Sequence, residues 1–272
     1  MNEKTSSPEP APPTHQLPNG LTVYHANKPE TEFLYREIFL ERTYLQHGIT
    51  LPPGACVFDV GANIGMFALF VKHTCPDATV FCFEPIPALN RLLALNLAPF
   101  GSSARVCPQG VSGKRGTATL TYYPGYSIMS GFHADTANDA QILSSSIRKQ
   151  VAGSSVKRRP LTDEQIREMA NYTLSQQVRL ECEMTTISQA IREARVEKID
   201  LLKIDAEKSE LEILSGIRDE DWGEINQLVL EAHSPAEAEQ VSALLNSKGF
   251  RLTLEQEDQL TNSGVFNCFA IR

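Results

Sequence analysis

The stretch FDVGANIG, residues 58–65, decides the fold of this chain of 272 residues. It has the pattern of a short buried strand that leads directly into a glycine-rich turn. The apolar residues Phe67, Leu69 and Val71 follow at the spacing of a helix. Ligands of open α/β sheets bind at the carboxyl ends of the strands, where glycine lets a ligand approach the backbone. We therefore predict a cofactor-binding turn at residues 61–65.

The residues of this turn distinguish between cofactors. A dinucleotide-binding turn carries G-x-G-x-x-G, whereas three residues separate Gly61 from Gly65, with Asp59 ahead of them and Asn63 between them. A carboxylate at Asp59 would repel a diphosphate, but it suits the ammonium and sulfonium charges of S-adenosylmethionine. Glu84 follows a second predicted strand, about 20 residues further on, where an acidic side chain accepts hydrogen bonds from both ribose hydroxyls. The five residues together favour S-adenosylmethionine.

Short apolar runs and amphipathic segments alternate along the rest of the chain. Strands are predicted at 57–60, 79–83, 104–107, 117–123, 200–204 and 227–231, and helices at 87–98, 209–216 and 235–247. Successive strand–helix units imply right-handed crossovers and a parallel sheet. Residues 251–254 and 265–271 are predicted to pair as an antiparallel hairpin at the sheet edge. The predicted fold is therefore a doubly wound, mostly parallel α/β sheet.

The N-terminal region differs from this alternation. Residues 1–29 carry many prolines and few large apolar side chains, which predicts a flexible leader. Residues 30–47 carry apolar side chains at roughly helical spacing, which predicts a helix packed beside the main fold. Residues 30–272 are predicted to form one domain, because a chain of this size buries one full-sized core.

Residues 135–179 interrupt the alternation a second time. They are polar and serine-rich, with a basic run at 157–159, and we interpret them as an insertion that forms a lid over the acceptor. Within this segment Thr162 and Gln165 have the spacing of a capping box, so a helix is predicted to begin at Asp163. The lid is therefore expected to be helical.

The composition excludes several classes of partner. The net charge of -8 argues against a nucleic-acid or anionic-membrane surface, because phosphate binding requires clustered Lys and Arg. No apolar run approaches the ~18 residues that a membrane span needs. Six cysteines without a C-x-x-C pair or a secretory leader indicate reduced thiols and a cytoplasmic protein. A small-molecule or protein-borne substrate is favoured.

Three ordered motifs make the sequence similar to a known family. D-V-G-A-N-I-G occupies residues 59–65, Glu84 precedes a proline, and L-L-K-I-D-A-E occupies residues 201–207. Over residues 56–233 the chain resembles the FkbM family of methyltransferases. The E-K-S-E sequence at residues 207–210 resembles the methyltransferase domains embedded in polyketide and nonribosomal peptide assembly lines.

This resemblance implies a class I methyltransferase-like fold, with a seven-stranded sheet that has an antiparallel C-terminal edge. It implies S-adenosyl-L-methionine as the cofactor and O-methylation of a hydroxyl or enol. The acceptor would be a small molecule or an intermediate bound to an acyl carrier protein. The chain would then be either a free-standing enzyme or one domain of a larger synthase.

His233 is the candidate general base. It follows the predicted strand 227–231, so it should project from the carboxyl edge, and an ordinary histidine pKa suits proton transfer near neutrality. Glu207 is its candidate partner. Asp205 and Glu207 have helix capping as an equally good explanation, because carboxylates favour the first helical turn. Two histidines are rival bases: His47 and His133.

Other residues complete the predicted site. Three residues after the third strand are expected near the adenine: Gln109, Gly110 and Val111. Four aromatic side chains are candidates for the acceptor pocket, although packing explains them as well: Tyr122, Tyr123, Tyr126 and Phe132. Asp205, Glu207 and His233 are chemically able to bind a metal ion, but no metal-binding spacing supports this, and no metal is expected.

Two other classes of function remain open from the sequence. A nicotinamide-dependent oxidoreductase could use Glu84 for its ribose equally well, although the third glycine of the dinucleotide turn is missing. A non-catalytic binding module would retain the fold without turnover. Nucleotide competition distinguishes the first alternative, and cofactor binding without methyl transfer identifies the second.

Overall fold

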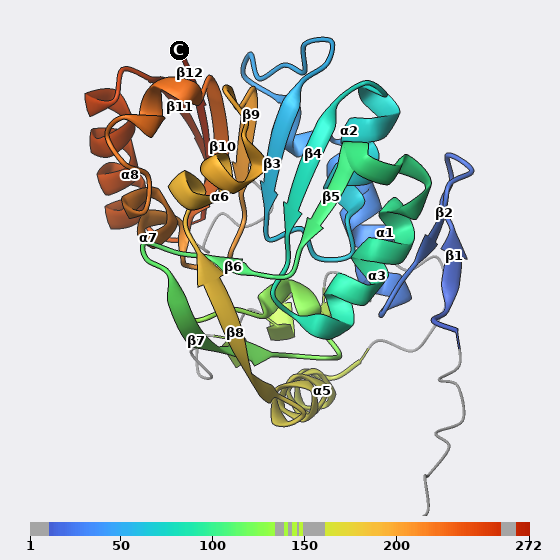
Figure 1. Ribbon diagram of the computed structural model, residues 1–272. Coiled ribbons are helices and arrows are strands. Elements are labelled where there is room, and N and C mark those ends of the chain that lie inside the picture. Colours follow the sequence, from blue (N-terminus) through green and yellow to red (C-terminus); the bar gives the residue numbers. More distant parts are fainter. Residues whose placement is uncertain (1–10, 134–138, 141–142, 146, 149–160, 257–264) are drawn as a thin grey trace, which may run out of the picture.

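A seven-stranded sheet runs through the centre of the part of the chain that the computed structural model describes, which is residues 11–133, 139–140, 143–145, 147–148, 161–256 and 265–272 (Figure 1). Its strands, in spatial order, are β11 (Arg251–Gln256), β12 (Phe266–Ile271), β10 (Gln227–Ala232), β9 (Leu201–Ile204), β3 (Cys56–Val60), β4 (Thr79–Phe83) and β5 (Ala104–Cys107). The last five of these are mutually parallel. β12 is antiparallel to both β10 and β11. The predicted doubly wound sheet with an antiparallel C-terminal edge is confirmed.

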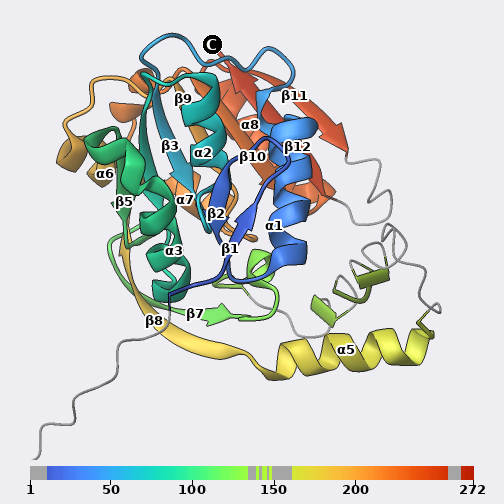
Figure 2. The same cartoon turned by 90° about the vertical axis from the view of Figure 1, so that its right-hand side faces the viewer.

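Helices cover both faces of this sheet (Figures 1 and 2). One face carries α1 (Lys28–Tyr35), α2 (Met66–Thr74) and α3 (Pro87–Leu97), and the other carries α6 (Ile187–Ala194), α7 (Glu210–Ser215) and α8 (Pro235–Ser247). Consecutive strand residues point to opposite faces. Val57 accordingly lies in the hydrophobic cluster under α1, α2 and α3, and Phe58 lies in the cluster under α6, α7 and α8. The strands have continuous apolar runs because both faces of the sheet are buried.

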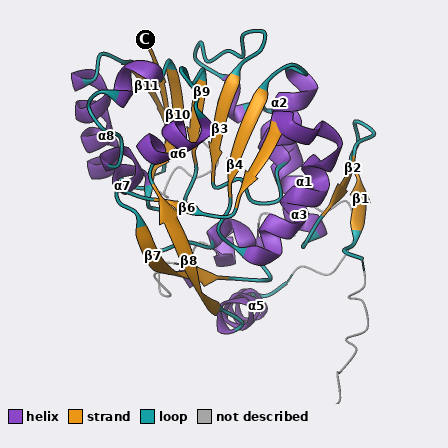
Figure 3. Ribbon diagram, viewed as in Figure 1, coloured by secondary structure: helices purple, strands orange, loops and turns teal. Residues whose placement is uncertain are grey.

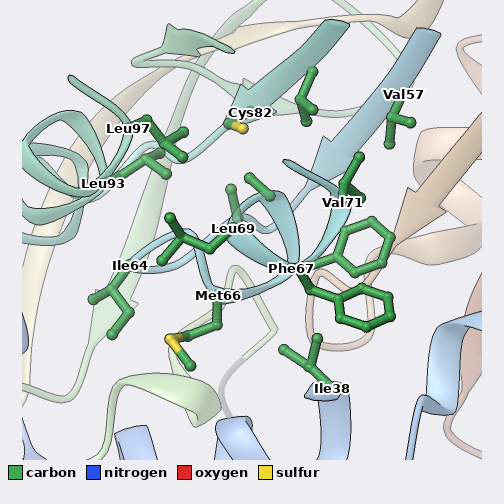
Figure 4. Packing of buried hydrophobic residues seen from close by; sticks show 14 of the residues in the cluster. Ile38, Val57, Ile64, Met66, Phe67, Leu69, Val71, Cys82, Leu93 and Leu97 are labelled. Atoms are coloured by element: carbon green, nitrogen blue, oxygen red, sulfur yellow. The ribbon is translucent and has the colours of Figure 1, made fainter. Parts of the chain in front are cut away.

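Helix α2 holds the glycine-rich turn in place. Residues 66–72 of this helix are all buried. Figure 4 shows its side chains packed among Ile38 of the π-helical turn η1 (Arg36–Leu40), Val57 of β3, and Leu93 and Leu97 of α3. Full burial of one large apolar side chain contributes about 1.5–3 kcal/mol. The turn before α2 is therefore fixed at both ends, by a central strand and by a helix of the core.

A second, smaller sheet lies beyond the carboxyl ends of the main strands (Figures 1 and 3). Its order is β6 (Gly110–Val111), β8 (Val178–Thr185), β7 (Gly116–Tyr122). The predicted helix is confirmed as α5 (Asp163–Ser175), with the Thr162–Gln165 capping box in place. α5 packs on Tyr123 and Tyr126 in a hydrophobic cluster of its own. Strand β8 and helix α6 were not predicted.

The lid prediction is covered by the structure only in part. Of residues 135–179, the segments 135–138, 141–142, 146 and 149–160 lie outside the described residues, and so does the basic run at 157–159. Whether the insertion closes over an acceptor stays a prediction. Among the described residues, no helix is long and apolar enough to cross a membrane.

The N-terminal prediction needs two corrections. Residues 1–10 lie outside the description, but the remainder of the predicted flexible leader includes an antiparallel hairpin of β1 (Thr14–Gln16) and β2 (Thr22–Tyr24). Its Leu17 and Val23 are buried, and the Asn96 amide pairs with both backbone groups of Tyr24, at 2.7 and 3.0 Å.

The helix predicted at residues 30–47 is shorter and begins earlier. Asn27 caps α1 by accepting a hydrogen bond from the Glu30 backbone N–H, so the helix starts at Lys28. Arg42 has a φ of 55°, a left-handed conformation that ends the helical run. The 3₁₀ turn η2 (Thr43–Leu45) follows. The other 3₁₀ turns are η3 (Ala98–Ser103), η4 (Ser127–Met129) and η5 (Asp221–Glu224).

Two glycines with similar backbones give a matched test of the contact between β3 and β9. Gly61 has a φ of 74°, and a Cβ there would lie 1.8 Å from the Asp205 carbonyl oxygen; Gly20 has a φ of 89° with nothing within 4 Å. We expect Gly61→Ala to lower the free energy of unfolding by about 3 kcal/mol, from backbone strain plus overpacking. Gly20→Ala should cost about 1 kcal/mol, from strain alone. Urea denaturation measures both, and equal losses would contradict the proposed close contact.

Candidate active site

The carboxyl ends of four parallel strands bring most of the predicted site residues to one edge of the sheet. The turn at 61–65 follows β3, Glu84 follows β4, Asp205 and Glu207 follow β9, and His233 follows β10. Parallel strands end at a common edge, so residues that are far apart in the sequence are gathered there. The described part of the chain contains no group of three or more His, Cys, Asp or Glu side chains that could hold a metal ion.

The glycine-rich turn makes its closest contacts with protein. The backbone N–H groups of Gly61 and Ala62 both donate to the Phe83 carbonyl, at 3.1 and 3.0 Å. A Cβ at Gly61 would collide with the Asp205 carbonyl, and one at Gly65 would lie 2.7 Å from Leu93 Cδ1. From the sequence, we expected a ligand to approach these glycines. In the structure, the approach of β9 and α3 already requires them.

Asp59 has a different partner from the one predicted. Its side chain is fully buried, and Oδ1 lies 3.0 Å from the Nζ of Lys203, its register partner on β9. The same Nζ lies 3.4 Å from Asp205 Oδ2 and donates to the Gly61 carbonyl at 3.1 Å. Lys203 therefore supplies a positive charge beside Asp59, and contact of Asp59 with a cofactor stays a prediction. Asp59 Oδ2 has no hydrogen-bond partner among the described residues.

Aromatic rings enclose this group of charges. Lys203 Nζ lies 5.3 Å from the ring centroid of Tyr44 and 5.9 Å from that of Phe67. The Tyr44 hydroxyl donates to Asp205 Oδ2 at 2.9 Å. Burial lowers the pKa of Lys203, but Asp59 and Asp205 outweigh it and raise the pKa above its ordinary value. Lys203 is therefore a permanent cation in the centre of the site, and Tyr44 was not identified from the sequence.

Glu84 is held in one orientation by the backbone. Its Oε2 accepts from the Asn63 N–H at 2.9 Å and its Oε1 accepts from the Ile86 N–H at 2.8 Å. Burial raises the pKa of Glu84 to about 7, although these two hydrogen bonds oppose the shift. Each carboxylate oxygen has a further lone pair. Glu84 is thus able to accept hydrogen bonds from a pair of hydroxyl groups.

The Asn63 side chain binds within the protein. Its φ is 50°, and its amide Nδ2 donates to the Ser127 hydroxyl at 3.0 Å while Oδ1 accepts from the Ile64 N–H at 2.7 Å. Both polar atoms of the side chain thus have partners within the protein, and direct contact of Asn63 with the cofactor stays a prediction. The backbone N–H of Asn63 instead orients Glu84.

Residues 109–111 lie beside the end of β4, because the Glu84 N–H donates to the Cys107 carbonyl at 3.1 Å. Gln109 is half-buried, while Gly110 and Val111 are buried in β6. A Cβ at Gly110 would lie 2.7 Å from Met184 Sδ. Their place after β5 agrees with the predicted position, and contact with an adenine stays a prediction.

His233 lies among carboxylates, and its nearest partner is Glu210. Nε2 lies 3.6 Å from Glu210 Oε1, and the backbone N–H donates to Glu237 Oε2 at 2.7 Å. Burial lowers the pKa of His233, but Glu210, then Glu207 and Glu231, raise it to about 10. The nearby carboxylates therefore place the pKa of His233 above that of an ordinary histidine.

Glu207 lies near enough to interact electrostatically with His233. Burial raises the pKa of Glu207 to about 8, and the His233 charge opposes that shift. Glu207 and Lys208 both have positive φ, 48° and 69°, directly after β9. Glu210, which the sequence analysis missed, also accepts from the Ala206 N–H at 3.0 Å. Its place in the first turn of α7, three residues after Glu207, was the available signal.

The other candidates lie in separate surroundings. His47 Nε2 pairs with Glu255 Oε2 of β11 at 2.9 Å, at the antiparallel edge of the sheet. His133 Nε2 lies 3.6 Å from Glu212 Oε2, and its side chain is half exposed. Tyr122, Tyr123 and Tyr126 are buried, the last two in the cluster with α5. Packing therefore accounts for Tyr123 and Tyr126.

The strand order and the two acidic strand ends define a class I methyltransferase-like fold. A model of the methyltransferase FkbM domain matches residues 59–252. The chain belongs to this methyltransferase family.

Curated relatives agree with this assignment. The chain is 39% identical over 260 residues to the 31-O-demethyl-FK506 methyltransferase FkbM of Streptomyces tacrolimicus, covering 95% of this chain and 96% of that protein. It is 36% identical over 264 residues to the AMB antimetabolite synthetase AmbE of Pseudomonas aeruginosa, covering 94% of this chain and 12% of that protein. Methyltransferase sdnD of Sordaria araneosa is 33% identical over 251 residues, with 88% of this chain and 89% of that protein covered.

Solved structures are more distant in sequence. Fibrillarin of Aeropyrum pernix, in complex with natively bound S-adenosyl-L-methionine, is 11% identical with a TM-score of 0.45, covering 86% of this chain and 74% of that chain. The METTL16 MTase domain is 9% identical with a TM-score of 0.45, covering 95% of this chain and 85% of that chain.

The ionisation of His233 can be measured directly. We expect its imidazole to titrate near pH 10 by NMR, and Glu210→Gln to lower that pKa because the carboxylate charge is removed. Since the folded-state pKa is raised above about 6.5, the associated stability is fully present below pH 6.5 and is lost as the pH rises through 10. Glu212→Gln, which removes the partner of His133, should leave His233 unchanged. Titration of His233 near pH 6.5 would show that the imidazole is neutral at pH 7.

Proposed function

We propose that this chain is an S-adenosyl-L-methionine-dependent O-methyltransferase. Its acceptor would be a hydroxyl or enol of a polyketide or nonribosomal peptide intermediate, bound to an acyl carrier protein. The observation that carries the proposal is the meeting, at one sheet edge, of the backbone-oriented Glu84 and of a buried His233 Nε2 that has no hydrogen-bond partner among the described residues. The Glu84 carboxylate is suited to accept hydrogen bonds from ribose hydroxyls, and His233 Nε2 is suited to bind the acceptor oxygen.

The residues present fit this cofactor. Glu84 offers two oriented oxygens to vicinal hydroxyls. The site region contains four acidic side chains: Asp59, Asp205, Glu207 and Glu231. Asp59 Oδ2 has no hydrogen-bond partner among the described residues. A site lined by acidic side chains favours a cationic ligand over a diphosphate. When bound, S-adenosyl-L-methionine supplies a methyl group on a sulfonium leaving group.

The preference for oxygen rests on relatives and on the candidate base. The name of the Streptomyces tacrolimicus protein specifies a 31-O-demethyl acceptor. The region matched in AmbE makes up 12% of a synthetase, and on this basis we propose that the acceptor of this chain is carrier-bound. Methyl transfer to a hydroxyl requires removal of its proton, and we assign that step to His233 with Glu207 as its partner.

The surroundings of His233 set the pH at which it acts. The base must be deprotonated, and the carboxylates around it raise its pKa to about 10. Glu207 ionises at a lower pH, near 8, and then stabilises the imidazolium. His233 therefore acts as a strong base whose neutral form is a minority at pH 7.

Family membership favours methyl transfer over the nicotinamide alternative, and binding tests both. By calorimetry we expect the protein to bind S-adenosyl-L-methionine and not a nicotinamide dinucleotide. Glu84→Ala should weaken binding on the order of 10- to 100-fold, since hydrogen bonds to a charged group contribute about 1.5–3 kcal/mol. Glu183→Ala, at an exposed carboxylate of β8, is the control. Binding of the dinucleotide alone would reject the proposal.

The base assignment predicts an alkaline pH profile. We expect kcat for methylation of carrier-bound β-hydroxy or enol acyl chains to rise between pH 7 and about pH 10. Glu210→Gln should move the rise to lower pH, because His233 loses its nearest carboxylate. His233→Ala should retain cofactor binding and lose at least about 100-fold in kcat. A His233→Ala enzyme with most of its activity would refute the role, and cofactor binding without turnover on any acceptor would favour a non-catalytic module.

A further inference from the structure

Glu30 is a buried carboxylate that the proposed mechanism does not use. It lies in the first turn of α1, outside the three motifs, and its side chain is 4% exposed. The Ser127 N–H donates to its Oε2 at 3.0 Å, and the Ser127 hydroxyl donates to its Oε1. The Ile128 backbone and the Asn63 side chain also act to lower the pKa of this carboxyl, against the larger effect of burial. All of these groups are donors, so the ionised form of Glu30 is the form that they bind.

A continuous series of hydrogen bonds connects Glu30 to Glu84. Ser127 donates to Glu30 and accepts from Asn63 Nδ2 at 3.0 Å. The backbone N–H of the same asparagine donates to Glu84 Oε2 at 2.9 Å. Asn63 has a φ of 50°, an uncommon conformation for a residue other than glycine. The contacts to its side chain therefore stabilise the backbone conformation that directs its N–H at Glu84.

Glu30 is costly to bury, which indicates a role other than fastening α1. Burial raises its pKa, and the hydrogen bonds only partly offset that effect. α1 has other attachments: Asn27 Nδ2 donates to the Gly125 carbonyl at 2.9 Å, and Tyr35 stacks on Phe39, which packs on Phe70 of α2. A neutral side chain at position 30 would avoid the desolvation cost without detaching the helix.

We propose that Glu30 is a positioning residue for the cofactor. Through Ser127 and Asn63 it holds the Glu84 carboxylate in the orientation that receives the ribose hydroxyls. The inference rests on the proposed function of Glu84. It assigns to the N-terminal helix, which lies before every family motif, a contribution to the affinity for S-adenosyl-L-methionine.

The test combines Glu30→Gln, Ser127→Ala and the double variant, with Glu32→Gln as the matched control. Glu32 lies on the same helix with its side chain 54% exposed. Calorimetry gives the Kd for S-adenosyl-L-methionine, thermal unfolding gives the Tm without ligand, and turnover separates KM from kcat. We expect each single variant to raise Kd and the cofactor KM on the order of 5- to 10-fold at nearly unchanged kcat. The double variant should lose little more, because both substitutions break the same series of hydrogen bonds.

Stability distinguishes positioning from a merely structural role. Glu30→Gln removes a desolvated charge and also one hydrogen-bond acceptor, and because these effects oppose each other its Tm should change little, whereas its Kd should rise. An unchanged Kd in Glu30→Gln, or an equal rise in Glu32→Gln, would overturn the inference while leaving the proposed function intact. A rise in Kd that only accompanies a fall in Tm would also overturn it. If the unaltered protein bound no S-adenosyl-L-methionine, the proposed function would fail and this inference with it.

Discussion

The rest of the site depends on the ion pairs that the buried ammonium of Lys203 forms with Asp59 and Asp205. On the face of the sheet under α1, α2 and α3, the register of β3 and β9 places Val57 beside Leu201 and then Asp59 beside Lys203. Removing one partner of a buried pair typically costs about 3–5 kcal/mol, because the other charge is left uncompensated. The pair therefore ties the two central strands at their carboxyl ends. Its further hydrogen bond to the Gly61 carbonyl extends that tie to the glycine-rich turn.

Much of the fold was predictable because local patterns and long-range packing agree in it. The limits of β4, β5 and α8 match the prediction, since buried apolar runs and the Ser234 cap determine them locally. β8 was missed although Leu180, Cys182 and Met184 alternate with polar residues, the pattern of a half-buried strand. The hairpin of β1 and β2 was missed because its strands have only three residues and lie in a proline-rich region. Its conformation depends on contacts with α3, such as the hydrogen bond from the Tyr24 N–H to Asn96.

The candidate site was predictable in position but not in ionisation. Strand ends in the sequence indicated where Glu84, Glu207 and His233 would gather. The charge of His233 depends on Glu210, which begins helix α7 more than twenty residues earlier in the chain, and no sequence pattern gives the 3.6 Å between them. Glu30 carries no pattern at all, because a carboxylate in the first turn of a helix is ordinarily explained by the helix dipole. Its burial depends on contacts with Ser127 in the 3₁₀ turn η4, which is 97 residues further along the chain.

The strand order at the C-terminal edge has a consequence for how the protein is made. β11 precedes β12 in the chain, yet its neighbour in the described sheet is β12, which lies between it and β10. During synthesis, β11 therefore leaves the ribosome before the strand that it pairs with. Until β12 arrives, β10 presents an open hydrogen-bonding edge, and unpaired edges of this kind recruit other chains. The last strand of the chain therefore completes the sheet, because its insertion pairs the edge of β10 and joins β11 to the other strands.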